Sequence, residues 1–259
     1  MSWLTRRKVA VLLALAFVIG LIEFLPAYWF ESRINAALPA PWRISVSGSV
    51  WDGFGVLQSG QTDMVAVPLT WKFNPKALTE LRAAWNIAPD GRGLSGNVSV
   101  GAGWRSLEIS DASLNIDADM LSQMFPVVAL LAPSGSFRLH TPATSRLTID
   151  YGNDFRARGA AEINVDNLGL RPTGPQTLGS YLLKITAQDT VIDYQIPQSS
   201  GALKLDGGGR IQIASPRTLT YTGSVTPSPS LPENVLSQLK SAGRVEADGR
   251  VRIEWKTQW

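Results

Sequence analysis

Two patterns of hydrophobic residues divide the chain, a continuous run near the N-terminus and an alternation of apolar and polar residues after it. The run occupies residues 9–22 without a polar side chain, is interrupted by Glu23, and continues to Phe30. As a helix, segment 9–30 would be about 33 Å long, enough to cross a bilayer core of about 30 Å. The pattern therefore predicts a transmembrane anchor over residues 9–30.

Charged and aromatic residues at the two ends of this segment indicate its orientation. Arg6, Arg7 and Lys8 precede it, and such cations hold their flank in the cytoplasm. Tyr28 and Trp29 lie at the far end, where amphipathic aromatic rings favour the headgroup layer. We therefore predict a cytoplasmic basic tail over residues 1–8 and export of everything that follows the anchor.

Two other interpretations of the apolar run are open. A cleaved signal peptide has small residues at its cleavage site, whereas Pro26, Tyr28, Trp29 and Phe30 occupy that region here. A buried helix of a soluble protein would not place a basic cluster beside a surface that is apolar on all sides. The residues favour a retained, single-pass anchor.

An alternation with a period of two begins at Arg43 and predicts β-strands. Ile44, Val46 and Val50 alternate with polar residues, and residues 65–73 place five apolar residues on one side. Further strands are predicted at residues 94–100, 107–109, 114–116, 137–139, 147–151, 161–170, 183–187, 192–196, 203–205, 211–213, 219–225 and 245–255. Short spacers suit hairpin turns, so the fold class is mostly β. We expect a long, twisted antiparallel meander whose twist can curl it into a groove.

Few helices interrupt the strands. Short helices are expected at residues 31–38, 75–81, 117–131 and 231–239. Asn74 would cap the second of these. Residues 31–42 are expected to form a linker, and residues 43–259 one exported β-rich domain. Pro68 lacks an amide donor, which predicts an edge position or a bulge there.

Composition and charge narrow the possible functions. The chain of 259 residues has a formal net charge of +3, and Arg6, Arg7 and Lys8 account for all of it. The exported part is therefore neutral overall and offers no basic surface for nucleic acid. Cysteine is absent, so no disulfide can stabilise the fold, and packing and strand pairing must do so.

Residues suited to catalysis are sparse. His140 is the single histidine, and without cysteine or a second histidine it cannot complete a metal cluster or a histidine-based triad. Asp117 and Asp119 flank a predicted helix start, where carboxylates cap backbone amides. The glycines after Asp206 lack the lysine and the following helix of a phosphate-binding loop. We predict no catalytic, cofactor-binding or metal-binding residues, and hence no enzyme.

Short motifs recur in a recognisable order along the chain. The first is Gly48-Ser-Val-Trp51-Asp-Gly53, and the second places Trp71 four residues before Pro75. Further motif positions are Gly96, Gly179, Tyr181, Gly201 and Gly207. This order resembles the type II secretion system protein N family over nearly the whole chain. The resemblance supplies no catalytic residues, so these positions are expected to be structural, with glycines in turns and tryptophans in the core.

The resemblance implies an accessory protein of the machinery that exports folded proteins across the outer membrane of Gram-negative bacteria. Such a protein would cross the inner membrane once, with its N-terminus in the cytoplasm and its bulk in the periplasm. One hypothesis is a scaffold that docks other type II secretion components. The alternative is a lipid-binding or lipid-transfer protein, because a curled sheet with an apolar face resembles the AsmA-like lipid-transfer proteins.

Trp71 distinguishes these two hypotheses. The alternation places it between Leu69 and Phe73 on one strand face, where we expect it to be buried. A face covered by a helix and loops would favour the scaffold. An open trough lined by valine, leucine, isoleucine and tryptophan would favour lipid.

Overall fold

The computed structural model describes residues 20, 24–38, 41–59, 66–80, 82–103, 105–124, 132–142, 145–151, 155–170 and 177–258. Most of the predicted anchor, with Arg6, Arg7 and Lys8, lies outside these residues. Within the described ranges, no helix is both long enough and apolar enough to cross a membrane. The anchor and its orientation therefore stay predictions up to residue 23. Its predicted end at residue 30 is wrong, because Leu25 and Ala27 bond to the turn after Trp42–Gly48 and a separate helix begins at Tyr28.

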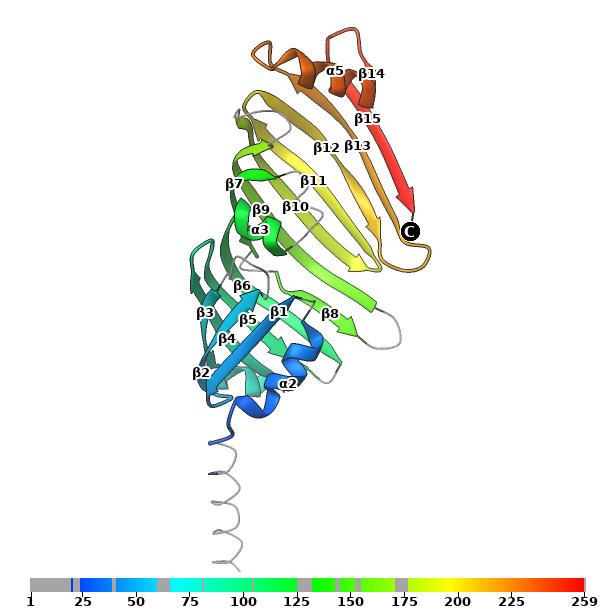
Figure 1. Ribbon diagram of the computed structural model, residues 1–259. Helices are drawn as coiled ribbons and strands as arrows, with labels where there is room; N and C mark the ends of the chain where they lie inside the picture. Colours follow the sequence, from blue (N-terminus) through cyan, green and yellow to red (C-terminus); the bar gives the residue numbers. More distant parts are fainter. Residues whose placement is uncertain are drawn as a thin grey trace, which may run out of the picture.

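Strands dominate the described part of the chain, as the alternation predicts (Figure 1). The strands are β1 (Trp42–Gly48), β2 (Asp52–Ser59), β3 (Ala66–Phe73), β4 (Ala83–Gly91), β5 (Leu94–Ala102), β6 (Ser106–Asp117), β7 (Pro133–His140), β8 (Leu147–Tyr151), β9 (Phe155–Leu170), β10 (Thr177–Asp189), β11 (Val191–Ser200), β12 (Leu203–Gln212), β13 (Thr218–Pro227), β14 (Arg244–Val245) and β15 (Val251–Gln258). The helices are α2 (Tyr28–Ala37), the 3₁₀ helix η1 (Pro75–Glu80), α3 (Ala118–Met124) and α5 (Glu233–Ala242). Each of the four predicted helices thus has a counterpart, although residues 125–131 of the third lie outside the described ranges.

The strands form one antiparallel sheet of 15 strands, and nearly every strand pairs with the one before it. Two long strands, β6 and β9, each take β7 and β8 as partners. In β6, for example, residues 113–117 pair with β7 and residues 106–109 pair with β8. The prediction of a long antiparallel meander is confirmed, with β8 as a side branch that sequence spacing alone did not predict.

Strand register aligns apolar residues in rows across one face of the sheet. In the second half, Phe137 of β7 lies opposite Val165 of β9, which lies opposite Tyr181 of β10. Successive side chains point to opposite faces, so polar residues gather on the other side. Val165 and Tyr181 are buried, whereas Phe137 is only half-buried.

The first half of the sheet curls back on itself. Figure 1 shows β1 and β2 in front of β4 and β5, with α3 above them. Trp42 of β1, Val67 of β3 and Met120 of α3 pack into one buried cluster. At the other end of the sheet, α5 places Val235 against Leu178 of β10. Short helices therefore cover only parts of the apolar face.

Two local expectations can be compared with the structure. In the segment expected as a linker, residues 31–42, the short helix predicted over residues 31–38 is present as part of α2, which extends to Ala37, and β1 begins at Trp42. β3 is an inner strand, but Pro68 itself lies at a local edge position, because it pairs with Val56 of β2 and with no residue of β4. Proline is tolerated there because pairing with β4 begins only at Leu69.

Candidate functional site

Tryptophans support the turn between β1 and β2, where several motif residues meet. Gly48 ends β1 with φ of +88°, a conformation that favours glycine. The indole N–H of Trp71 donates a hydrogen bond of 3.0 Å to the carbonyl of Ser49. The indole N–H of Trp85 donates one of 2.8 Å to the carbonyl of Val50. Side chains from β3 and β4 thus fix the turn from across the sheet.

The Trp71 ring lies over two glycines of β2. A methyl group on Gly53 would overlap this ring, and one on Gly55 would press against it. Trp51 packs edge-on against Phe73, with ring centroids 4.6 Å apart. Glycine at position 53 is therefore required by the packing of Trp71, which agrees with a structural role for these motif positions.

An apolar pocket of about 530 Å³ lies between α2 and this part of the sheet. Its lining residues are Ala27, Phe30, Ile34, Ile44, Val46, Val50, Leu69, Trp71, Trp85, Ile87 and Val100. Trp71 is half-buried and faces this pocket, so the expectation that it is buried in the core is wrong. Because both indole N–H groups are already bonded to carbonyls, the lining side chains offer no free hydrogen-bonding group.

Helix α2 also covers the outer edge of β1. Asn35 Nδ2 donates to the carbonyl of Ile44 at 2.9 Å, and Asn35 Oδ1 accepts from the amide of the same residue at 2.7 Å. The amide of Val46 donates to Glu31 Oε2 at 3.0 Å. The bonded groups are the ones that β1 would need for pairing with a further strand. Because α2 occupies them, no further strand can pair with β1 at Ile44 and Val46.

The opposite edge of the sheet is open over most of β15. The two-residue strand β14 covers only its start. The amide of Glu246 donates to the carbonyl of Arg250, so the even-numbered residues of β15 direct their backbone groups away from β13. Within the described part of the chain, Glu254 and Lys256 have no strand on that side. Trp255, between them, is 51% exposed.

The motif positions of the second half lie away from the pocket. Tyr181 donates to the carbonyl of Leu203 at 2.7 Å, and burial raises the pKa of Tyr181 to about 12. Gly201 has φ of +107° and stands against the backbone of Gly179, while Gly207 has φ of +147°. The expectation that the motif glycines lie in turns is wrong for Gly179 and Gly207, which lie within β10 and β12, where they allow close strand contact. These residues form no common site with the pocket.

The remaining predicted positions are also dispersed. Pro75 begins η1, where Asn74 Oδ1 accepts from the amide of Lys76 at 3.1 Å, as expected of a cap. Gly96 has φ of +132° and lies tightly against the backbone of β6. His140 is exposed at the end of β7. The described residues contain no group of three or more histidines, cysteines or carboxylates that could hold a metal ion.

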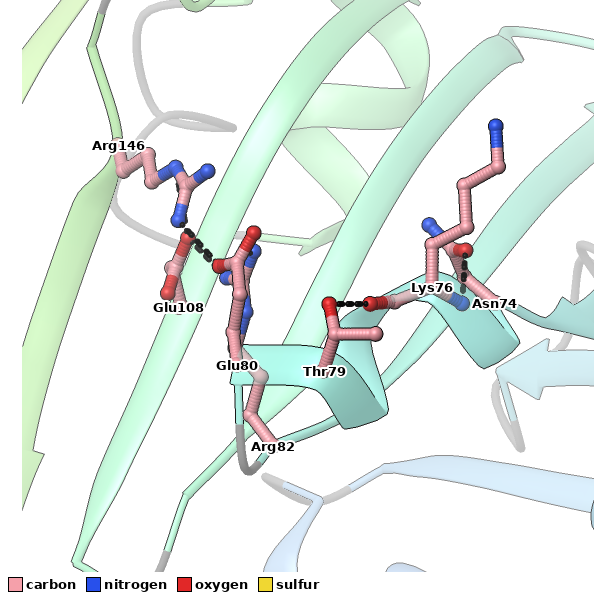
Figure 2. A network of polar contacts seen from close by, with 7 residues as sticks. All are labelled: Asn74, Lys76, Thr79, Glu80, Arg82, Glu108 and Arg146. Atoms are coloured by element: carbon pink, nitrogen blue, oxygen red, sulfur yellow. Dashed lines mark hydrogen bonds and ion pairs between the residues drawn. The ribbon is translucent and has the colours of Figure 1, made fainter.

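A network of alternating charges lies on the polar face of the first half (Figure 2). Arg82 and Arg146 each pair with Glu80 and Glu108, with 2.7 Å between Arg82 Nη2 and Glu80 Oε2. The hydrogen bond from Arg146 lowers the pKa of Glu80. Sequence reasoning missed this network because Glu80 and Arg146 lie 66 positions apart. These ion pairs connect the end of η1, β6 and the segment before β8.

The described residues thus define a mostly β protein built on one curled antiparallel sheet. The family model for type II secretion system protein N matches residues 42–254, so the chain belongs to that family and is a component of type II secretion. It is similar to the type II secretion system protein N of Aeromonas hydrophila, with 25% identity over 263 residues, 96% of this chain and 98% of the relative. No solved structure matches the chain.

Proposed function

We propose that this secretion component is held in the inner membrane by the part of the predicted anchor 9–30 that precedes Leu25, because Leu25, Pro26 and Ala27 pair with the sheet, and that it acts in the periplasm as a scaffold for other parts of the machinery. The family supports a role in secretion. The apolar run after Arg6, Arg7 and Lys8 supports the anchor and its orientation. The open edge of β15 supports docking.

The difference between the two edges of the sheet carries the scaffold proposal. Natural sheets block their edges to avoid unwanted pairing, and α2 does so at β1. No strand or helix of the described part does so beside Glu254 and Lys256. An open edge accepts an extended segment through main-chain hydrogen bonds, with exposed side chains such as Trp255 adding specificity. An extended segment of another secretion component would extend the sheet there.

A proline at Lys256 tests the docking role. Lys256→Pro removes an amide that faces away from β13, so the domain keeps its own pairing and loses a donor for the partner. In cells that lack the protein, we expect Lys256→Pro to restore secretion poorly and Lys256→Ala to restore it well. Normal secretion with Lys256→Pro, at equal protein level, would contradict docking at this edge.

The anchor is tested by reversing the charge of its flank. Replacing Arg6, Arg7 and Lys8 with glutamate should impair the orientation, because positive flanks determine topology. A reporter that is active only in the periplasm, fused after Trp259, should then lose activity. Full activity in this variant would count against the predicted orientation.

Lipid binding or transfer in an AsmA-like groove is the second candidate function. The observation in its favour is that helices leave much of the apolar face half-buried, including Phe137, Leu183 and Tyr221. Purification of the full chain in mild detergent, followed by lipid extraction and mass spectrometry, tests it. Phospholipid at a stoichiometric level would support this candidate, and lipid at the level of an unrelated single-span protein would oppose it.

A further inference from the structure

We propose that the apolar pocket beneath α2 binds one acyl chain of a membrane phospholipid. The inference deepens the lipid-binding candidate, whose ligand class it shares, and it does not depend on the scaffold role. The proposed site is one pocket at the N-terminal end of the sheet. It differs from a groove that would guide lipid along the whole sheet.

The chemistry of the lining excludes a polar ligand. The side chains are aliphatic or aromatic, and the only polar atoms among them, the indole nitrogens of Trp71 and Trp85, donate to Ser49 and Val50. A polar ligand would lose its hydrogen bonds to water without replacement. The volume of about 530 Å³ lies within the range of about 300–1,000 Å³ that is usual for ligand pockets. An extended hydrocarbon chain fits both constraints.

The position of the pocket identifies the source of that chain. The amide of Val50 donates to the carbonyl of Leu25 at 2.9 Å, and that of Ala27 donates to Gly48 at 3.0 Å, so the start of α2 is fixed to the sheet. The apolar run 9–22 ends directly before this segment in the sequence. If that run spans the bilayer, the pocket lies next to the acyl chains of the outer leaflet.

The residues around the pocket provide an entrance from the membrane side. Phe30 and Ile34 line it from α2 and are 38% and 39% exposed, so the pocket is accessible past this helix. Phe24 and Trp29 are more exposed still, at 78% and 60%. Large apolar and aromatic side chains exposed beside an anchor are typical of the bilayer interface, where a lipid tail could leave its leaflet.

Photo-crosslinking with a lipid probe tests the proposal. The full chain would be placed in nanodiscs of phosphatidylethanolamine and phosphatidylglycerol with a small share of phosphatidylethanolamine that carries a diazirine at the end of one acyl chain. After illumination, mass spectrometry should find adducts on residues of the sheet that line the pocket, such as Ile44, Leu69 and Val100. Absence of adducts from these residues would overturn the proposal, whether the pocket is empty or holds another part of a protein.

Two matched pairs of variants make the test specific. Val46→Trp fills the pocket, whereas Val245→Trp adds the same ring at an exposed site in β14. We expect labelling of the pocket residues to fall about tenfold in Val46→Trp and to stay unchanged in Val245→Trp. The added ring in Val46→Trp would exclude methylene groups of the acyl chain from the pocket, and each excluded methylene weakens binding. Ile34→Glu and Val245→Glu repeat the comparison without altering β1, in case Val46→Trp fails to fold.

The pattern of adducts separates this proposal from the groove hypothesis. Adducts on Phe137 and Tyr221 without any in the pocket would overturn the pocket and leave the lipid groove standing. No adducts at either place would overturn both. Equal labelling of the pocket in Val46→Trp and the unchanged protein would also overturn the proposal.

Discussion

The two edges of the sheet are treated in opposite ways. At β1, side chains from α2 bond the outward backbone groups of Ile44 and Val46. At β15, the equivalent groups of Glu254 and Lys256 face solvent within the described ranges. The covered edge lies beside α2, which follows the predicted anchor in the sequence, and Figure 1 places the open edge at the far end of the sheet. Within the described residues, one edge is thus closed to a further strand and the other can accept one.

Removing the Trp71 ring should have the largest effect on the covered end. Trp71→Ala loses the packing over Gly53 and the hydrogen bond to Ser49. We expect the free energy of unfolding to fall by about 3 kcal/mol, the lower end of the range for aromatic truncations because the ring is half-buried. Trp71→Phe should cost clearly less. Urea unfolding followed by circular dichroism measures both, and equal stability of Trp71→Ala and the unchanged protein would contradict this role.

Uncovering β1 should have the next largest effect. Asn35→Ala leaves the amide and carbonyl of Ile44 without their partner, which should cost about 1–3 kcal/mol. It should also make the chain self-associate, because β1 becomes a second open edge. Sedimentation and urea unfolding measure these effects, with Arg33→Ala on the exposed side of α2 as control. If both variants behaved alike, α2 would not be protecting the edge.

Prolines at neighbouring positions of β15 should differ in their effect. Ile253 directs its amide toward β13, whereas Glu254 directs its amide to the open side. We therefore expect Ile253→Pro to lower the free energy of unfolding by at least about 1 kcal/mol more than Glu254→Pro, the net value of one ladder hydrogen bond. Thermal unfolding of the two variants provides the comparison. The opposite order would mean that the assignment of the open side is wrong.

The charge network of Glu80, Arg82, Glu108 and Arg146 in the first half should contribute least to stability. The hydrogen bond from Arg146 lowers the pKa of Glu80 in the folded protein, so ionised Glu80 adds stability above its ordinary pKa. This contribution is lost as the pH falls through the lowered pKa. The unchanged protein should therefore be slightly more stable than Glu80→Gln at neutral pH. This difference in the free energy of unfolding should vanish in acid. Urea midpoints over a pH series measure it, and a gap that widened in acid would contradict the network.

Local patterns were sufficient to predict the sheet. The alternation from Arg43 onward and the short spacers between strands depend on neighbouring residues, and they led correctly to an antiparallel meander. Alternation shows which side of a strand is apolar but not what covers that side. Trp71 was therefore expected in the core, whereas it faces a pocket.

The candidate sites depend on contacts that no local pattern encodes. Asn35 reads as an ordinary polar residue of a helix, and its bonds to Ile44 follow only from the way α2 lies beside β1. The open side of β15 follows from the shortness of β14, which the sequence did not predict as a separate strand. The first feature depends on how a helix packs beside a strand and the second on where a strand ends, and neither is encoded in the residues next to it in the sequence.

Amide hydrogen exchange resolved to single residues tests the contrast between the two edges most directly. In the isolated full chain, the amides of Ile44 and Val46 should exchange slowly, because they donate to Asn35 and Glu31. The amides of Glu254 and Lys256 should exchange fast, although the strand that holds them is paired with β13. Protection of Glu254 and Lys256 equal to that of Ile44 and Val46 would contradict an open edge and the docking role built on it.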